Sequence, residues 1–310
     1  MRFHKIVLAA CMFSSIFLFL AGLNILAHPY SPPAEKKPIA EYSPVRTEQP
    51  REEKPVQAVE PINILLLGLD GEEVRSDVMI LLNFSPEHKK LNILSIARDT
   101  KVKARNRTSK INALIRTGGE KLVMEKVEEI TGLPVHYYAT LNFKGFRKVI
   151  DTLDGVEMNV PFDMDYDDPE QNLYIHLKKG RQVLNGKKAE QLVRYRKGNK
   201  RGQGYIDGDI GRIKMQQEFI KGLITQKAKL KYISKADDIY LILRKHFKSN
   251  ITLADISSNL KNMTGIKYEE IKTYTLPGES AYTDGIWYFI YNKKETRKLI
   301  DENFFTAPEP

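Results

Sequence analysis

Cysteine is almost absent from this chain of 310 residues, which contains only Cys11. Cys11 ends the stretch LAAC, which looks like a lipoprotein signal. However, only five apolar residues precede it and the apolar run continues for 16 more. We therefore interpret Cys11 as a membrane cysteine. The rest of the chain has no thiol, which excludes disulfides and cysteine-based metal or redox chemistry there.

Several catalytic signatures are also missing. The sequence has no GxxxxGK[ST] phosphate loop, no GxSxG elbow and no HExxH motif. Nucleotide hydrolysis, serine esterase chemistry and zinc protease chemistry therefore lack support. Four histidines lie in the expected main domain after residue 60 and none pair at metal-ligand spacing, so we interpret them as ordinary residues: His88, His136, His176 and His246.

The N-terminal segment is apolar and long. Residues 6–27 contain no charged side chain, and Arg2 and Lys5 precede them. At about 1.5 Å per residue this run can span a bilayer. The positive-inside rule then predicts a cytoplasmic tail at 1–5, a single transmembrane anchor at 6–27 and an extracytoplasmic main domain. A cleaved signal peptide is the alternative, which the large residues Ile25 and Leu26 disfavour.

Proline and charge dominate the next segment, residues 28–60. It holds seven of the 15 prolines and eleven charged side chains, with few large apolar residues. This composition predicts an extended, solvated stalk. Hydrophobic residues make up 42% of the whole chain, which is enough to give the remaining 250 residues a substantial core.

The remaining sequence alternates between strand-like and helix-like patterns. Strands are expected at 62–71, twice within 77–96, and at 136–143 and 156–162; helices are expected at 118–132, 144–155, 184–198 and 209–228. The residues between 163 and 172 are expected to form an acidic loop. The tail, 233–305, is expected to contain helices and one aromatic strand at 285–291. This order favours an α/β domain with helices on both faces of a sheet.

Charged residues gather where the first three expected strands begin or end. Asp70 ends the first strand, Arg75 and Asp77 precede the second, and Arg98 and Asp99 end the third. Ligands of open α/β sheets bind at such strand ends. Carboxylates interleaved with arginines suit a divalent cation bound to a phosphate. For any one such pair alone, a structural salt bridge is the more ordinary interpretation.

A second concentration of charge is basic. Residues 176–214 contain twelve Lys or Arg and three acidic residues, a net of +9 out of +10 for the whole chain. A solvated helix face or a nucleic-acid patch is the usual meaning of such a run. The expected membrane anchor argues against nucleic acid and favours anionic lipids or anionic polymers as partners.

Six ordered blocks resemble one known family. NILLLGLD, RSDVMILLNFSPEHKKLNILSIARDT, SKINAL with GG soon after, DTLDGVEMNVP, LNGKKAEQLVRYRKG and DIGRIKMQQEF occur in the order seen in LytR-CpsA-Psr proteins. The resemblance covers about residues 62–225. It implies a central mixed β-sheet flanked by helices in an α-β-α sandwich, with a catalytic core at 61–230 and residues 231–310 completing the domain.

The resemblance also implies an activity. LytR-CpsA-Psr proteins are membrane-anchored phosphotransferases that move an anionic glycopolymer, such as teichoic acid or capsular polysaccharide, from a polyprenyl pyrophosphate carrier to peptidoglycan. The bond formed is a phosphodiester, Mg²⁺ assists, with Mn²⁺ as an alternative, and the polyprenyl chain lies in an apolar cleft between sheet and helices.

Site residues follow from the resemblance position by position. The catalytic residues would be Asp70, Asp77 and Arg98. Asp70, Asp77 and Asp209 would be the carboxylates around the metal ion, and Asp99 would orient Arg98. The pyrophosphate ligands would be Arg75, Arg98, Lys110, Arg194, Arg196, Arg212 and Gln216.

The sequence also departs from the family pattern. Ala97, Val78, Glu72 and Met215 stand where the family usually has Pro, Thr, Arg and Arg, so two expected phosphate-binding arginines are absent. Arg116 is a candidate replacement. A non-catalytic binder of lipid-linked polymer, a phosphatase acting on the same carrier and, on the basic balance alone, a transcriptional regulator remain as alternatives. The sequence leaves open which polymer is transferred and which aspartate is the general base.

Overall fold

The structure, a computed structural model, describes residues 61–70, 75–200, 202–227, 246–251 and 266–305. The expected tail at 1–5, anchor at 6–27 and stalk at 28–60 lie outside these residues. Within the described ranges, no helix is both long and apolar enough to cross a membrane.

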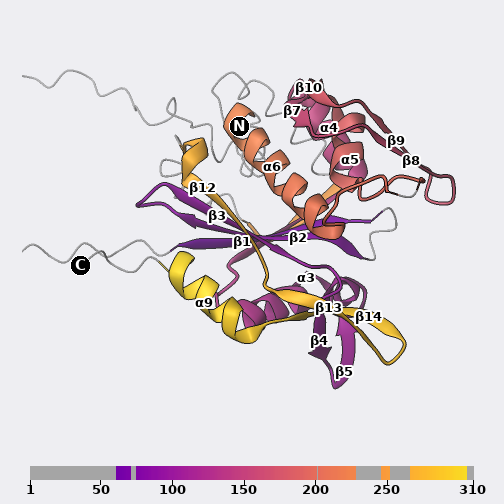
Figure 1. Cartoon of the computed structure of the whole chain (residues 1–310). Coiled ribbons are helices and arrows are strands. Elements are labelled where there is room, and N and C mark those ends of the chain that lie inside the picture. The colour runs from indigo at the N-terminus through magenta and orange to yellow at the C-terminus, as the bar shows by residue number, and fades with distance from the viewer. Residues whose placement is uncertain (1–60, 71–74, 201, 228–245, 252–265, 306–310) are drawn as a thin grey trace, which may run out of the picture.

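A six-stranded mixed sheet forms the centre of the molecule (Figure 1). Its order is β11-β6-β1-β2-β3-β12. β1 pairs antiparallel with β2 and parallel with β6, while β3 pairs antiparallel with β2 and parallel with β12. The strand bounds are β1 Ile62–Leu69, β2 Ser76–Ser85, β3 Lys90–Ile96, β6 Tyr137–Asn142, β11 Phe247–Ser249 and β12 Ile271–Thr275.

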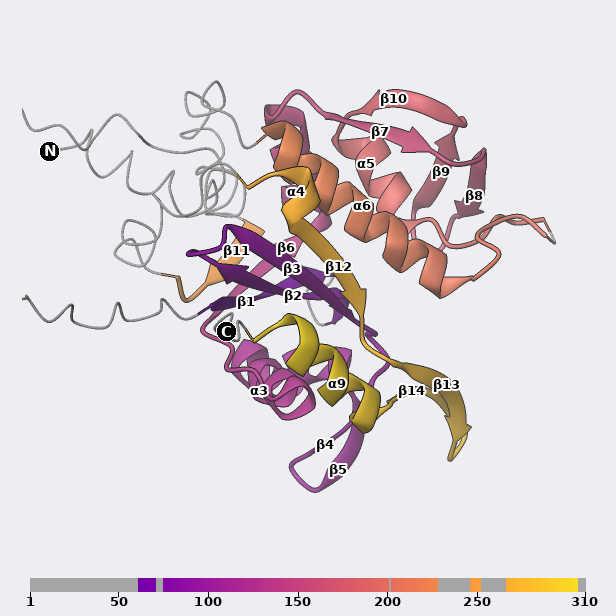
Figure 2. The same ribbon diagram turned by 60° about the vertical axis from the view of Figure 1, so that its left-hand side comes forward.

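Helices cover both faces of this sheet, as Figures 1 and 2 show. One face carries α3 (Leu114–Thr131) and α9 (Lys293–Asn303). The other carries α4 (Phe143–Thr152), α5 (Gly186–Arg194) and α6 (Asp209–Lys227). The expected α/β architecture, a central mixed sheet flanked by helices, is therefore confirmed.

Strand β1 shows why the sheet is buried on both sides. Leu65, Leu67 and Leu69 point into the core under α3 and α9, whereas Ile64 packs in the core that includes Ile224 of α6. A strand covered on both faces needs apolar side chains at successive positions, and so reads as a continuous apolar run.

Helix ends follow local capping rules. The side chains of Asn142 and Asn185 accept hydrogen bonds from the N–H groups of Gly145 and Lys188 and so cap α4 and α5. Gly132 ends α3 in the left-handed region, at a φ of 73°. The helix expected at 118–132 is confirmed; a short helical segment from Leu114 precedes it, and Gly119, at a φ of 67°, forms a kink between the two.

Residues 163–172 correct the sequence analysis, because residues 164–168 form a strand and only 169–172 form a turn. Met164–Asp168 is strand β8, which pairs antiparallel with β9, Leu173–Leu177. Met164 and Ile175 are buried against the helices, while the acidic side chains alternate outward. The acidic composition concealed a period-two pattern.

Other short ladders flank the main sheet. The aromatic strand expected at 285–291 is present as β14, but β11, β12 and β13 of the tail were missed by the sequence analysis. The two-stranded ladders are β4 Lys101–Ala104 with β5 Arg107–Lys110, β7 Val156–Val160 with β10 Gly180–Leu184, and β13 Gly278–Thr283 with β14 Ile286–Tyr291. Single 3₁₀ turns, η1 and η4, span Ile111–Ala113 and Tyr268–Glu270.

Candidate active site

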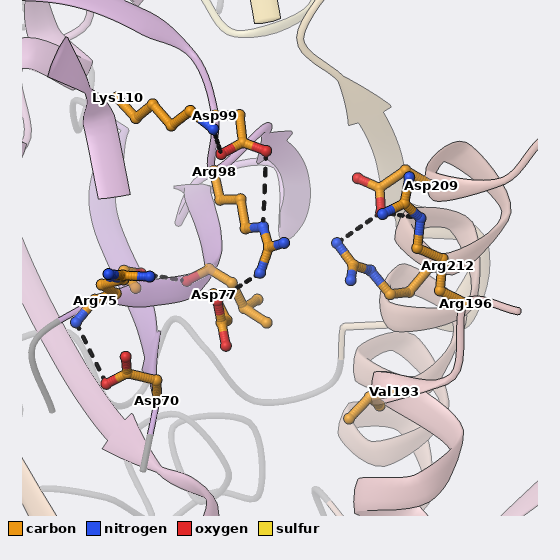
Figure 3. A network of polar contacts seen from close by, with 12 residues as sticks. Asp70, Arg75, Asp77, Arg98, Asp99, Lys110, Val193, Arg196, Asp209 and Arg212 are labelled. Carbon is orange, nitrogen blue, oxygen red and sulfur yellow. Dashed lines mark hydrogen bonds and ion pairs between the residues drawn. The ribbon is translucent and has the colours of Figure 1, made fainter. Parts of the chain in front are cut away.

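The site begins where β2 starts and β3 ends. The ladder between these strands pairs Met79 with Ile96, so Asp77 and Arg98 face each other two residues further along. Arg98 Nη1 donates to Asp77 Oδ1 at 2.7 Å (Figure 3). Asp99 lies 3.9 Å from Arg98 Nε and 3.0 Å from Lys110 Nζ. The expected orienting contact of Asp99 is therefore long, and its closer partner is Lys110.

Arg98 is held firmly by its backbone and remains charged. Its carbonyl accepts a hydrogen bond from Asn112 N at 3.1 Å, and the next carbonyl, of Asp99, accepts one from Phe289 N at 2.9 Å. Burial lowers the pKa of the guanidinium, but Asp77 and the other nearby carboxylates raise it by more, so that the net pKa lies above its ordinary value. Arg98 therefore presents a positively charged guanidinium group from a backbone held in place on both sides.

The opposite wall is formed by the end of α5 and the start of α6 (Figure 3). Arg212 Nη2 lies 2.7 Å from Asp209 Oδ1, and Arg196 Nε lies 3.6 Å from the same oxygen. Burial lowers the pKa of Arg212, and the positive charges of Arg98 and Arg196 lower it further against the opposing effect of Asp209. Three guanidinium groups therefore lie within electrostatic range of one another, an arrangement that an anion would stabilise.

Arg194 is positioned by residues that the sequence analysis did not single out. Glu190, which is 6% exposed, accepts hydrogen bonds from Arg194 at 2.8 Å and from Arg147 of α4 at 2.9 Å. The Phe143 ring lies 4.6 Å from the Arg194 guanidinium carbon. The i,i+4 spacing of Glu190 and Arg194 on a helix was a usable signal. Nothing in the sequence indicated Arg147.

The two walls enclose a polar cavity, which we call the arginine cavity. Its lining includes six of the predicted site residues: Asp77, Arg98, Arg194, Arg196, Arg212 and Gln216. The structure thus brings together residues from β2, the end of β3, α5 and α6 that are up to 139 positions apart in the sequence.

A second cavity, the apolar cavity, adjoins the first. It lies between the sheet and helices α4 and α6, and its lining includes Leu66, Ile80, Ala139, Phe219 and Leu223. The linings of the two cavities have four residues in common: Val78, Phe143, Val193 and Gln216. Gln216 Nε2 donates to Val193 O at 2.9 Å, which ties α6 to α5 at this junction.

A third cavity, the β5 cavity, lies on the far side of the Asp77–Arg98 pair. Two predicted pyrophosphate ligands, Arg75 and Lys110, line this cavity and not the arginine cavity. The full lining is Arg75, Asp77, Arg98, Asp99, Thr108, Ser109, Lys110, Asn112, Ala113, Arg116, Ile286 and Tyr288.

The three predicted metal ligands do not form one cluster. Asp77 and Asp209 stand on facing walls, and Asp70 lines none of the three cavities; its Oδ1 accepts a hydrogen bond from Arg75 N at 3.3 Å (Figure 3). Across the described part of the chain, no three His, Cys, Asp or Glu side chains are close enough to hold a metal ion by themselves.

The chain matches a known protein family over most of its length. A family model described as the LytR_cpsA_psr family matches residues 33–304. The chain belongs to the LytR-CpsA-Psr family.

Characterised relatives carry transferase names. The chain is 31% identical over 264 residues to TagV of Bacillus subtilis (strain 168), named polyisoprenyl-teichoic acid--peptidoglycan teichoic acid transferase; the match covers 80% of this chain and 66% of TagV, just under two thirds of its length. It is also 31% identical over 238 residues to TagU of the same organism, which has the same enzyme name, covering 74% of this chain and 72% of TagU.

Solved structures of the LytR-CpsA-Psr family have the same fold. The crystal structure of B. subtilis TagV aligns with a TM-score of 0.65 at 28% identity, over 80% of this chain and 99% of that one. TagT bound to LI-WTA aligns with a TM-score of 0.62 at 27% identity, over 82% and 92% of the two chains.

The structure shows where two residues lie that bear on the departures from the LytR-CpsA-Psr sequence pattern. Met215 packs as a partly buried residue against the core around α5. Arg116 lines the β5 cavity together with Arg98, so it adds positive charge on that side and not in the arginine cavity. Glu72 lies outside the described residues.

Proposed function

We propose that this chain transfers an anionic glycopolymer from a polyprenyl pyrophosphate carrier to peptidoglycan and forms a phosphodiester bond. The observation that carries the proposal is the junction of the arginine cavity with the apolar cavity, which have four lining residues in common. A polyprenyl pyrophosphate has the same two parts, a doubly charged head and a long apolar tail. The names of TagV and TagU support the same reaction class.

The arginines would stabilise charge during transfer. In phosphoryl transfer the attacking and leaving oxygens lie in line with the phosphorus, and negative charge builds on the phosphoryl oxygens and the leaving group. Arg98, Arg194, Arg196 and Arg212 line the cavity on two facing walls, so they can bind these oxygens from both sides. Carboxylates hold Arg98, Arg194 and Arg212 in place before the reaction, which limits reorganisation in the transition state.

Asp77 is the best placed carboxylate to accept the proton of the attacking hydroxyl. It lines both the arginine cavity and the β5 cavity, whereas Asp70 lines neither. A hydroxyl that enters from the β5 cavity would therefore meet Asp77 on its way to the phosphorus. The contact with Arg98 holds the carboxylate in place.

The carboxylates of this site could bind Mg²⁺ only if the substrate supplied further oxygen ligands. Mg²⁺ is typically bound by one or two carboxylates, substrate phosphates and water. Asp77 and Asp209 on the facing walls could supply the protein ligands, with pyrophosphate oxygens supplying others, but a three-carboxylate site with Asp70 does not fit the geometry. When bound, the ion would neutralise phosphoryl charge together with the arginines. Mn²⁺ suits the same oxygen ligands.

We further propose that residues 6–27 anchor the protein in the cell membrane and that the described domain lies outside the cell. The uncharged run of 22 residues and the basic residues before it support this topology. A membrane-tethered enzyme would meet a lipid-linked donor at the membrane surface, and the stalk at 28–60 would let the domain reach peptidoglycan.

An in vitro transfer assay tests the proposal. Full-length protein in detergent is mixed with lipid-linked polymer, peptidoglycan fragments and Mg²⁺, and the phosphodiester product is quantified. Wild type should form product, and Asp77→Asn and Arg98→Ala should form almost none. Asp284→Asn, on the tip of the β13–β14 hairpin, is the matched control and should behave as wild type.

The same assay separates the alternatives. A protein that binds the donor tightly and yields neither product nor free polymer would be a non-catalytic binder. Release of polymer phosphate without peptidoglycan product would identify a phosphatase, in which water attacks in place of a sugar hydroxyl. Equal product from wild type, Asp77→Asn and Arg98→Ala would show that the site assignment is wrong.

A further inference from the structure

The β5 cavity lies beside the Asp77–Arg98 pair. Its volume is about 500 Å³, within the usual range for small-molecule sites. Its lining includes two residues of the arginine cavity, Asp77 and Arg98, and no residue of the apolar cavity. The β5 cavity therefore reaches Asp77 and Arg98 from a different side than the arginine cavity does.

Two largely buried side chains present polar atoms to this cavity. Asn112 is 8% exposed and Tyr288 is 7% exposed, and both line the cavity. Neither the Asn112 carboxamide nor the Tyr288 hydroxyl forms a hydrogen bond with any described residue. Neither group is among the fully buried polar atoms that lack a partner, so both remain accessible although most of each residue is covered. These two groups are therefore available to a ligand in the cavity that offers hydrogen-bond donors and acceptors.

We propose that the β5 cavity binds the acceptor sugar of the peptidoglycan glycan, an N-acetylhexosamine, and that Asn112 and Tyr288 are its binding residues. This inference rests on the proposed transfer activity and assigns the second substrate of the same reaction. A neutral sugar ring presents hydroxyl and acetamido groups, which match a carboxamide and a phenol. The apolar side chain of Ile286, 44% exposed at the rim, can contact the carbon face of the ring.

The charge distribution favours a sugar over the anionic polymer inside the cavity. Lys110 is paired with Asp99 at 3.0 Å, and Arg98 with Asp77 at 2.7 Å, so the deep cations are already neutralised. Arg75 and Arg116, by contrast, are exposed residues of the lining. There they can meet the carboxylates of the peptide that substitutes the acceptor sugar.

Reaction geometry leads to the same assignment. In-line displacement requires the nucleophile to approach opposite the leaving group. The polyprenyl phosphate would leave toward the apolar cavity, and the acceptor would enter from the β5 cavity. The acceptor hydroxyl oxygen bonds to the phosphorus that carries the polymer, the bond from that phosphorus to the polyprenyl phosphate oxygen breaks, and the hydroxyl proton passes to Asp77.

The only tryptophan of the chain offers a direct binding assay. Trp287 is adjacent to Tyr288 in β14 and is 60% exposed. Full-length protein in detergent is titrated with two probes, chitotetraose and a lipid-free disaccharide-peptide fragment of peptidoglycan, while tryptophan emission is recorded. We expect both probes to change the emission. Tyr288→Phe and Asn112→Ala should each raise the Kd by about fivefold, and Tyr174→Phe, an exposed tyrosine on β9, should leave it unchanged.

Steady-state kinetics provide a second readout. Tyr288→Phe should raise the KM for the acceptor fragment and leave the KM for the lipid-linked donor unchanged. Tyr288→Phe retains the ring that stacks with Lys101, and Asn112→Ser is a second, smaller change if Asn112→Ala unfolds.

The outcomes distinguish this inference from the proposed function. If wild type transfers polymer but Trp287 responds to soluble anionic polymer and not to glycan, the β5 cavity binds the donor polymer and the inference is wrong. Unchanged Kd values in both cavity variants would overturn it as well. Glycan binding that depends on Asn112 and Tyr288 in a protein without transfer activity would support the cavity assignment and refute the transferase.

Discussion

Asp77 and Arg98 form an ion pair that contributes little to stability. Their side chains are 31% and 35% exposed, and the atoms in contact lie 2.7 Å apart. Ion pairs this accessible to solvent contribute about 0–1 kcal/mol to folding. The pair nevertheless lies where the arginine cavity and the β5 cavity meet, and this position suits a role in binding and chemistry.

Replacing Arg98 by lysine should therefore impair transfer and leave the fold intact. Lysine keeps the positive charge but cannot make two parallel hydrogen bonds to a phosphoryl group. We expect the transfer rate of Arg98→Lys to fall by about 10- to 100-fold. The thermal unfolding midpoint should change by less than about 2 °C. Initial rates and a melting curve measure both quantities, with Arg181→Lys on β10 as an exposed control. An unimpaired rate would show that a point charge at position 98 is sufficient.

Replacing Asp77 or Asp70 by asparagine should affect transfer activity to very different extents. Asp77→Asn should reduce transfer by at least about 100-fold, because the proton acceptor is lost. Asp70→Asn should retain activity to within about threefold, since Asp70 lines neither polar cavity and its side chain accepts a hydrogen bond from the Arg75 backbone at the end of a strand. The transfer rates of the two variants, measured in parallel at a saturating concentration of donor, test this difference. An equal loss in both variants would restore Asp70 to the catalytic set.

Sequence patterns predicted the elements that carry their own signal. The apolar run at 62–69 and the capped helices α4 and α5 follow local rules, and the strand ends placed Asp77 beside Arg98. The acidic hairpin at 163–177 was missed because its acidic composition concealed the alternation of buried and exposed positions. The tail strand β12 was missed because its pairing depends on a partner far along the chain. β12 pairs with β3 across about 180 residues.

Some residues of the candidate site could likewise be predicted from the sequence, and others could not. Arg194 and Arg212 were identified through a resemblance, and the structure places both at one cavity with Arg98. The roles of Arg147 and Tyr288 could not be predicted, because each depends on a contact between distant elements. The separation of Lys110 and Arg75 from the arginine cavity also had no sequence signal. Both residues lie near Arg98, but on its other side.

Glu190 should act as a positioning residue for Arg194. Glu190 is 6% exposed, and its carboxylate binds both Arg147 and Arg194. Glu190→Gln should lower the free energy of unfolding by about 1–3 kcal/mol, a value at the low end for buried pairs because the arginines are partly exposed. It should also raise the KM for the donor by about tenfold, since Arg194 loses its anchor. Glu157→Gln, which breaks an exposed pair with Arg181, is the control.

A double-mutant cycle checks whether this cluster acts as a unit. Arg147→Ala alone should destabilise the protein, because it removes one of the two arginine partners of a buried carboxylate. In the double variant with Glu190→Gln the loss should be smaller than the sum of the single losses by about 1 kcal/mol. Additive losses would mean that Glu190 and Arg147 are not coupled. The donor KM would then have to be explained by the direct contacts of Arg194 alone.

Filling the apolar cavity should change the preference for the lipid of the donor. Ala139 of β6 lines this cavity and is 3% exposed, so Ala139→Leu would place three additional carbon atoms in the space proposed for the polyprenyl chain. Overpacking costs about 1–3 kcal/mol, which the fold can tolerate if the cavity accepts the added volume. The KM for a donor with a long polyprenyl chain should rise by about tenfold, and the KM for a donor with two isoprene units should stay the same, because the shorter chain would remain near the arginines. Comparing the two donors in one variant separates loss of lipid binding from loss of fold. An equal rise for both donors would place the lipid elsewhere.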